Sequence, residues 1–389
     1  MREGWTYRKL GEVGDVITGS TPSTKDENNY NSSDFCFVKP SDIPKQGIGL
    51  LNETEFYISK KAYDNSRKLP KGSVLTTCIG IIGKVGILNV DATCNQQINA
   101  IIPHSDISSI FLAYSILSKR HYLEHIANAP VVPIINKKEF SNTPIYVPPL
   151  AEQERIVAEL DLLSSIIETK KAQLKEYDQL AQSIFYDMFG DPITNEKGWV
   201  VKRLEEIVSV RGRVGWKGYK KEDLRESGPL AIGGGHITEN GFLDFSSPVY
   251  LSKEKFDESP EIIVKQGDLI MVQRGTIGRI GLVRNNIGDA TINPCVLILR
   301  PQSIMDIYLL HLMLNKNMQS FLEGLVRGVA QPMITQKQVK SIDIPLPPLS
   351  LQQEFAAKIE AIEKQKSLIQ QSIKETETLF NSRMDYYFN

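Results

Sequence analysis

Two stretches of the chain carry apolar residues at alternating intervals of four and three, which is the spacing of a coiled-coil seam. They run from about Ala151 to Phe189 and from about Ser350 to Phe388. At 1.5 Å per residue, each stretch predicts a helix of roughly 60 Å, too long for an ordinary core helix. We expect the two helices to pack antiparallel on each other. The predicted seam consists of Ile156, Leu160, Leu163, Ile167, Leu174, Ala181, Ile184 and Met188, facing Phe355, Ile359, Ile362, Ile369, Ile373, Phe380 and Tyr387.

Two lysines, Lys170 and Lys366, interrupt this apolar seam. A charged residue at a seam position can fix the register of two helices at some cost in stability. We therefore expect both lysines to specify how the helices align.

The segments outside the long helices mix short strands with shorter helices. Val74 to Cys78, Asp268 to Gln273 and Cys295 to Arg300 have the β-branched, apolar composition of strands. Apolar helical stretches follow near Ile107 to Ile126 and near Met305 to Leu325. The pattern predicts an α+β protein with two globules, each with its own core.

The second half of the chain repeats the first. Leu69 to Leu75, followed by glycines at 80, 83 and 86, returns as Val264 to Ile270, followed by glycines at 275, 278 and 281. Pro148-Pro149-Leu150 returns as Pro347-Pro348-Leu349, in each case directly before a long helix. A repeat this long indicates one architecture used twice. We divide the chain into a first globule at 1–150, a long helix at 151–190, a second globule at 191–349 and a second long helix at 350–389.

Composition and charge narrow the functional classes only slightly. The formal net charge of −1 argues against a uniformly basic nucleic-acid coat but leaves local patches open. The four cysteines lack the paired spacing of a zinc site or a disulfide framework. The chain has neither an export signal nor an apolar run of the roughly 18 residues that a membrane helix needs. We expect a cytoplasmic protein with reduced thiols that does not contact membranes.

The arrangement resembles the specificity subunit of type I restriction-modification systems over nearly the whole chain. The resemblance rests on Trp5 and Leu10, on Pro148 to Gln153 with Ile156, on Phe185 to Asp191, and on Pro347-Pro348-Leu349 with Gln352. It implies two α/β target-recognition domains, each reading one half of a split site in double-stranded DNA, joined by two long antiparallel coiled-coil helices that set the spacing.

The resemblance also implies partners and cofactors. Two modification subunits would dock on the helices, bind S-adenosylmethionine and methylate adenine. Restriction subunits, where present, would add translocation and cleavage that use ATP and magnesium. This chain would then hold no cofactor, no metal and no catalytic residue.

The second half contains the sharpest candidate for DNA contact, a basic loop that includes glycines and two aromatic residues. Lysines there would neutralise phosphates and arginines could read guanine edges, although a solvated surface loop is the alternative. The candidate residues are Arg211, Arg213, Trp216, Lys217, Tyr219, Lys220 and Lys221. Arg274 and Arg279, which bracket a glycine-rich turn, and Lys84 in the first half are weaker candidates.

The first half offers neutral hydrogen-bonding groups at the corresponding place. Ser20, Thr21 and Lys25 lie in an early loop rich in Ser, Thr and Asn. Asn95, Gln96 and Gln97 form a second candidate, because Asn and Gln can pair bidentately with adenine. These amides could equally serve only to satisfy backbone groups at the end of a strand.

Three short motifs suggest enzymes but are better explained otherwise. His121 to His125 matches the H-x-x-E-H pattern of zinc proteases, yet the second repeat has Met318 and Leu322 at the two histidine positions. The glycine runs that start at Gly80 and Gly275 lack the Lys-Ser/Thr ending of a phosphate loop, and we expect tight β turns there. Asn293-Pro294-Cys295 lacks the second proline and the aromatic residue of an amino-methyltransferase motif.

Two other functions remain open from the sequence. The chain could belong to another restriction-modification enzyme with a split site, either as its DNA-binding subunit or with nuclease chemistry, which would need an acidic metal site. It could also be a coiled-coil scaffold whose globules bind protein, and insensitivity of binding to polyanions and salt would favour that class.

Overall fold

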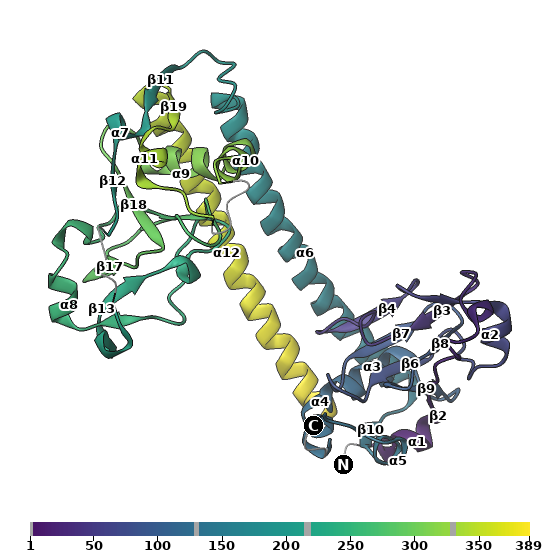
Figure 1. The fold of residues 1–389 in the computed structure, drawn as a ribbon. Helices are drawn as coiled ribbons and strands as arrows, with labels where there is room; N and C mark the ends of the chain where they lie inside the picture. The colour runs from purple at the N-terminus through teal and green to yellow at the C-terminus, as the bar shows by residue number, and fades with distance from the viewer. Residues whose placement is uncertain (1–2, 128–131, 214–218, 327–331) are drawn as a thin grey trace. The chain divides into compact units, whose positions relative to one another are not determined.

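The computed structural model describes residues 3–127, 132–213, 219–326 and 332–389. It divides into two compact units, each of which takes one globule and part of both long helices. Unit 1 comprises residues 1–171 and 371–389, and unit 2 comprises residues 172–370. The expected α+β class with two repeats and two long helices is confirmed, because every element type recurs in both units (Figure 1).

Unit 1 contains three sheets. A five-stranded sheet has the order β2-β9-β6-β7-β4, a three-stranded sheet has the order β5-β3-β8, and β1 pairs antiparallel with β10. Among the strand pairs described in unit 1, only β4–β7 and β3–β8 are parallel. The strands are β1 (Thr6–Lys9), β2 (Gly14–Thr18), β3 (Phe35–Val38), β4 (Ile48–Leu51), β5 (Tyr57–Ile58), β6 (Val74–Thr77), β7 (Val85–Leu88), β8 (Ala92–Cys94), β9 (Ile98–Pro103) and β10 (Pro144–Val147). The short helices are α1 (Leu10–Val13), α2 (Lys60–Asp64), α3 (Ser109–Ser118), α4 (Arg120–Ile126) and α5 (Lys137–Ser141).

Unit 2 repeats this topology except at one edge of the main sheet, where its described residues form no counterpart of β4. Its sheets have the orders β12-β18-β15-β16 and β14-β13-β17, and β11 pairs antiparallel with β19. The strands are β11 (Val200–Arg203), β12 (Val208–Arg211), β13 (Leu224–Ile232), β14 (Tyr250–Leu251), β15 (Leu269–Val272), β16 (Ile280–Leu282), β17 (Ala290–Ile292), β18 (Val296–Pro301) and β19 (Asp343–Leu346). The short helices are α7 (Leu204–Ile207), α8 (Lys253–Asp257), α9 (Asp306–Leu314), α10 (Lys316–Gly324) and α11 (Gln336–Lys340).

The glycine runs form tight turns, as the sequence predicted. Gly80 and Gly83 link β6 to β7 with φ angles of 78° and 76°, and Gly275 and Gly278 link β15 to β16 with φ angles of 97° and 81°. Such positive φ angles disfavour residues with a Cβ atom.

Each of the two apolar helical stretches that the sequence predicted forms two helices, α3 and α4 in unit 1 and α9 and α10 in unit 2. In unit 2 the side chain of Asn315 caps α10 by accepting hydrogen bonds from the backbone of Asn317 and Met318.

The two long helices are α6 (Leu150–Phe189) and α12 (Leu349–Phe388), each of 40 residues. Within unit 1 they run antiparallel, because Lys170 donates to Ser372 and Thr376 while Arg383 is bonded to Glu159. Within unit 2 Lys366, only 8% exposed at its side chain, contacts Asp178 at 2.7 Å and Glu363 at 3.2 Å. Both lysines therefore interrupt the seam with polar contacts to the facing helix, as expected. Among the described residues, no helix is both long enough and apolar enough to cross a membrane.

Every predicted seam position is buried or half-buried. Some seam residues also belong to apolar clusters that include residues of the globules. In unit 2 the rings of Phe185 and Phe189 pack between Tyr308 of α9 and Phe355 of α12, with ring centroids between 4.7 and 5.7 Å apart. Phe185 and Phe189 were not assigned to the predicted seam. They are more buried than the neighbouring Ile184 and Met188 because α9 covers this face of the helix.

A buried glutamine fastens each globule to the start of its long helix. The side-chain oxygen of Gln153 accepts from the backbone N–H of Ser108 at 2.9 Å, and its nitrogen donates to the carbonyls of Asp106 and Pro148. In unit 2 Gln352 accepts from the N–H of Met305 at 2.9 Å and donates to the carbonyl of Pro347. Ser108 and Met305 are the N-cap residues of α3 and α9. One amide thus joins the cap, the Pro-Pro turn and the long helix.

Replacing Gln153 by leucine keeps the approximate volume but leaves Ser108, Asp106 and Pro148 without these buried partners. We expect the free energy of unfolding to fall by about 2–4 kcal/mol, since each buried polar group left unpaired costs about 1–3 kcal/mol. Gln352→Leu should act in the same direction. Urea denaturation followed by circular dichroism measures the effect, and Gln173→Leu on the exposed face of α6 is the matched control. Equal stability of Gln153→Leu and Gln173→Leu would contradict this role.

Candidate nucleic-acid interface

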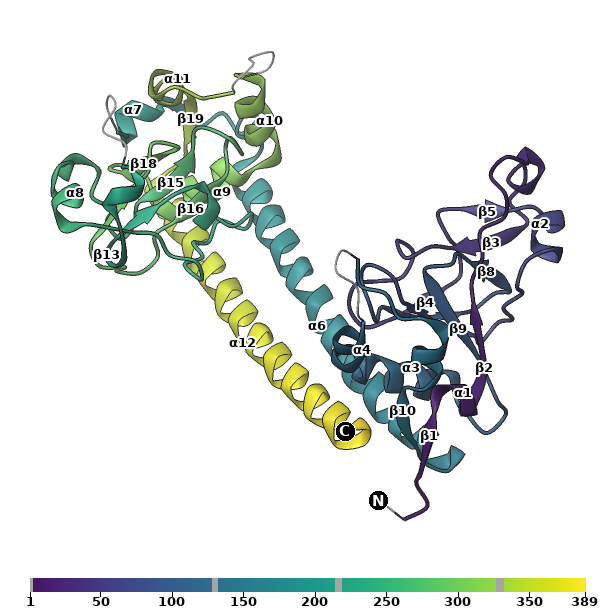
Figure 2. The same ribbon diagram turned by 60° about the horizontal axis from the view of Figure 1, so that its bottom comes forward.

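Five of the predicted contact residues of unit 1, namely Ser20, Thr21, Asn95, Gln96 and Gln97, lie together at one edge of the globule. The loop that follows β2 passes over the turn between β8 and β9, where Ser20 N–H donates to the carbonyl of Cys94 at 2.9 Å. Gly19 makes this approach possible, because a Cβ atom there would lie 2.1 Å from the carbonyl oxygen of Asn95. The structure thereby brings Ser20 and Thr21 next to the Asn95–Gln97 turn. Figure 2 shows β2, β8 and β9 close to one another in this unit.

The three amides of this turn have different roles. Asn95 is buried, and its side chain accepts from Gln97 N–H at 3.1 Å and donates to the Gln97 side-chain oxygen at 2.9 Å. Asn95 and Gln97 are therefore bonded to each other across the turn. This is the structural role that the sequence left open as an alternative to DNA contact. Gln96 is exposed, and its side-chain oxygen accepts a hydrogen bond from the Thr21 hydroxyl at 2.6 Å.

Two exposed cations lie in the loop after β2 or contact its base. Lys25 is exposed on the loop after β2. Arg67, which the sequence reasoning did not single out, is also exposed and donates to the carbonyl of Thr18 at the base of the same loop. Arg67 is close to this loop only in the folded chain, because 48 residues separate it in sequence from its partner Thr18.

Lys84 is turned inward. The residue is 5% exposed, and its side-chain ammonium donates to the carbonyl of Pro40. Burial lowers the pKa of this ammonium below its ordinary value. Its counterpart Arg279 is half-buried and donates to the carbonyl of Ile237 at 3.4 Å. Both cations tie a glycine turn to a neighbouring loop. This placement favours a supporting role for Lys84 over direct contact with DNA.

Unit 2 builds the same edge with different side chains. By strand register, Gly212 is the counterpart of Thr18, and Arg213 takes the place of Gly19. Arg213 is 8% exposed and its Nε donates to the carbonyl of Ile292 at 3.0 Å, the position equivalent to Cys94. Burial lowers the pKa of this guanidinium, and nearby Tyr219 opposes that shift. Arg213 therefore points into the globule and is bonded to the last residue of β17.

Other predicted residues of unit 2 differ in exposure. Lys220, Lys221 and Arg274 are exposed, which leaves their charges accessible to phosphates. Arg211 is half-buried, and its Nε donates to the Ser209 hydroxyl at 3.1 Å. Trp216 and Lys217 lie outside the described residues. DNA contact by any of these side chains stays a prediction.

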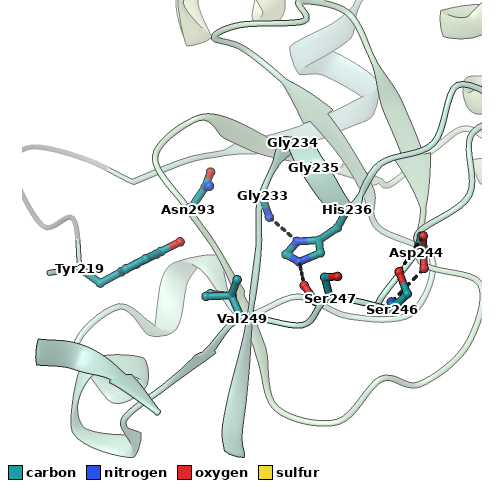
Figure 3. A pocket seen from close by; sticks show the side chains of 11 residues that line it. Tyr219, Gly233, Gly234, Gly235, His236, Asp244, Ser246, Ser247, Val249 and Asn293 are labelled. Carbon is teal, nitrogen blue, oxygen red and sulfur yellow. Dashed lines mark hydrogen bonds between the residues drawn. The ribbon is translucent and has the colours of Figure 1, made fainter. Parts of the chain in front are cut away.

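A cavity of about 380 Å³ opens beside this edge of unit 2 (Figure 3). Tyr219 and Asn293 line one side and His236 lines the other, with glycines 233–235 between them. His236 Nδ1 accepts from Gly233 N–H at 3.0 Å and Nε2 lies 3.2 Å from the carbonyl oxygen of Ser247, so Nε2 must carry the proton. Both ring nitrogens are hydrogen-bonded, so this neutral imidazole connects Gly233 to Ser247 in the wall of the cavity.

The H-x-x-E-H motif lies on the surface helix α4. His121 is 99% exposed at its side chain, and Glu124 contacts Arg120 at 3.0 Å as well as His121 at 3.3 Å. Within the described ranges, no group of three or more His, Cys, Asp and Glu side chains is placed to hold a metal ion. The pKa of Cys78 is raised to about 12 by burial, so this thiol is not activated as a nucleophile.

Solved structures share this fold. A chain from a structure of the type I R-M system, described as the basis of its complex assembly and conformational transition, has a TM-score of 0.63 and 21% sequence identity. The alignment covers 99% of this chain and 97% of that chain.

Relatives of known name are specificity subunits. The MjaIX specificity subunit of Methanocaldococcus jannaschii is 31% identical over 225 residues, which is 53% of this chain and 52% of that protein, about half its length. The MjaVIII specificity subunit of the same organism is 25% identical over 410 residues, covering 97% of this chain and 89% of that protein. The family model for the type I restriction modification DNA specificity domain matches residues 2–176 and 196–378. The chain therefore belongs to the type I restriction-modification DNA specificity family.

Proposed function

We propose that this chain determines the DNA sequence at which a type I restriction-modification complex acts, and that each unit binds one half of a bipartite target in double-stranded DNA. The edge that both units build beside the turns at Asn95–Gln97 and Asn293–Cys295 carries the proposal. Each unit holds a loop against a turn of fixed geometry, and loops on a rigid scaffold are where recognition residues concentrate. The different side chains at the two edges are what two unlike half-sites would require.

The chain supplies recognition and no chemistry of its own in this proposal. Two modification subunits dock on α6 and α12, bind S-adenosylmethionine and methylate adenine. Restriction subunits, where they are part of the complex, use ATP and magnesium. The family assignment supports this division of labour and gives no support to a protein-binding scaffold.

The two edges suggest different means of recognition. In unit 1 the exposed groups are mainly neutral, namely the Thr21 hydroxyl and the Gln96 amide, with Lys25 and Arg67 beside them. In unit 2 the exposed cations Lys220, Lys221 and Arg274 provide phosphate contacts. Phosphate contacts position a protein on the duplex, whereas groups that reach base edges specify sequence.

Expression of the chain with its modification subunit should produce methyladenine at one split motif. A host that expresses the modification subunit alone should lack that methylation, because the modification subunit would have no means of selecting the site. Methylome sequencing of both hosts makes the comparison. Methylation that is the same with and without this chain would refute the proposed function.

Replacing Lys220, Lys221 and Arg274 together by alanine should weaken DNA binding by similar factors on specific and unrelated duplexes. Each lost phosphate contact should also reduce the slope of log affinity against log salt by about 0.9. Equilibrium binding of the reconstituted complex over a range of salt concentrations measures both effects. Lys202→Ala, at an exposed position of β11 where the lysine contacts Glu206, serves as the control for loss of charge. An unchanged slope in the triple variant would remove these residues from the interface.

A further inference from the structure

The turn between β8 and β9 is rigid on both sides of its middle residue. Asn95 N–H donates to the carbonyl of Val38 at 3.0 Å, and the carbonyl of Gln97 accepts from Cys78 N–H at 2.8 Å. Together with the side-chain bonds between Asn95 and Gln97, these contacts tie the turn to two neighbouring strands. The backbone of Gln96 is therefore held while its side chain is exposed.

Unit 2 uses the same turn with a different middle residue. Asn293 N–H donates to the carbonyl of Ile232 at 2.9 Å, and the Asn293 side chain accepts from Cys295 N–H at 2.9 Å. The residue between them is Pro294, which has no side-chain polar group. The flanking asparagine thus maintains the turn in both units, and only its middle residue changes from an amide to an apolar ring.

Thr21 sets the direction of the Gln96 amide. Its hydroxyl donates to the side-chain oxygen of Gln96 and uses one lone pair of that oxygen. A glutamine amide has a second lone pair on oxygen and two N–H donors on nitrogen. The loop that carries Thr21 is itself held, because Tyr30 OH donates to the carbonyl of Pro22 at 2.7 Å and Ser59 N–H donates to the carbonyl of Asn29 at 2.9 Å.

We propose that Gln96, oriented by Thr21, reads one adenine–thymine base pair in the half-site bound by unit 1. The amide nitrogen donates to adenine N7, and the second lone pair of the amide oxygen accepts from the adenine N6 amino group, which is the bidentate pairing open to glutamine in the major groove. Positive charge for the phosphates comes from the exposed Arg67, which is bonded to Thr18 at the base of the Thr21 loop, and from the exposed Lys25 in that loop. This inference rests on the proposed function.

The test uses the reconstituted complex with modification subunits and a panel of duplexes in which each base pair of the methylated motif is replaced in turn. For the native chain, replacing the adenine–thymine pair read by Gln96 should weaken binding by roughly 10- to 100-fold. Gln96→Ala should remove that penalty at one position of one half-site and keep the penalties elsewhere. Gln46→Ala, at another exposed glutamine of unit 1, should match the native chain.

Two further variants distinguish base recognition by Gln96 from a purely structural role of this residue in the turn. Gln96→Glu can accept hydrogen bonds but cannot donate to N7, so preference at this position should move from adenine toward cytosine. Thr21→Val removes the hydroxyl at nearly constant volume and should reduce discrimination at the same base pair and no other. A general structural role would instead weaken all positions of the half-site together.

The inference is overturned if Gln96→Ala discriminates like the native chain at every position, if the relaxed position is a guanine–cytosine pair, or if several positions relax at once. Failure of the proposed function is distinguishable from these results. In that case the native complex itself would show no preference among the duplexes.

Discussion

The architecture depends on one buried side-chain amide in each unit. Gln153 and Gln352 lie at the first turn of their long helices, 0% and 1% exposed, and each bonds to the N-cap residue of a globular helix and to the Pro-Pro turn. An unpaired amide in such a place is costly, so the globule and the helix start must keep the geometry that satisfies it. One apolar cluster in each unit, which includes Phe111 and Ile156 in unit 1 and Tyr308 and Phe355 in unit 2, then packs around a joint whose orientation is already defined.

This joint allows each recognition edge to vary without disturbing the fold. The edges share their asparagine turns and a bond to the carbonyl of Cys94 or Ile292, and these features need no particular side chain at the exposed positions. Gln96 in unit 1 and Pro294 in unit 2 show how different the exposed residue can be. A protein that must read two unlike half-sites gains from such a separation, because changes in specificity cost little stability.

Periodicity and repetition in the sequence were sufficient to predict the long helices, the two globules and the glycine turns, since these depend on local patterns. Burial of individual polar residues was not predictable in the same way. Lys84 and Arg213 are cations that fold back onto carbonyl groups of Pro40 and Ile292, segments more than 40 residues away. Asn95, Gln96 and Gln97 are adjacent amides, and only the three-dimensional turn distinguishes the one that is exposed. Arg67 reaches the edge through folding alone and had no sequence signal.

The most direct measurement is the methylome of a host expressing the modification subunit with a chain in which residues 10–147 are replaced by residues 204–346. The replacement begins at the equivalent residues Leu10 and Leu204 and ends at the equivalent strands β10 and β19, so Gln153 meets the N–H of the transplanted Met305. If each unit reads one half-site independently, the methylated motif should contain the half-site of unit 2 twice and lose that of unit 1. Retention of the half-site of unit 1 would contradict the account.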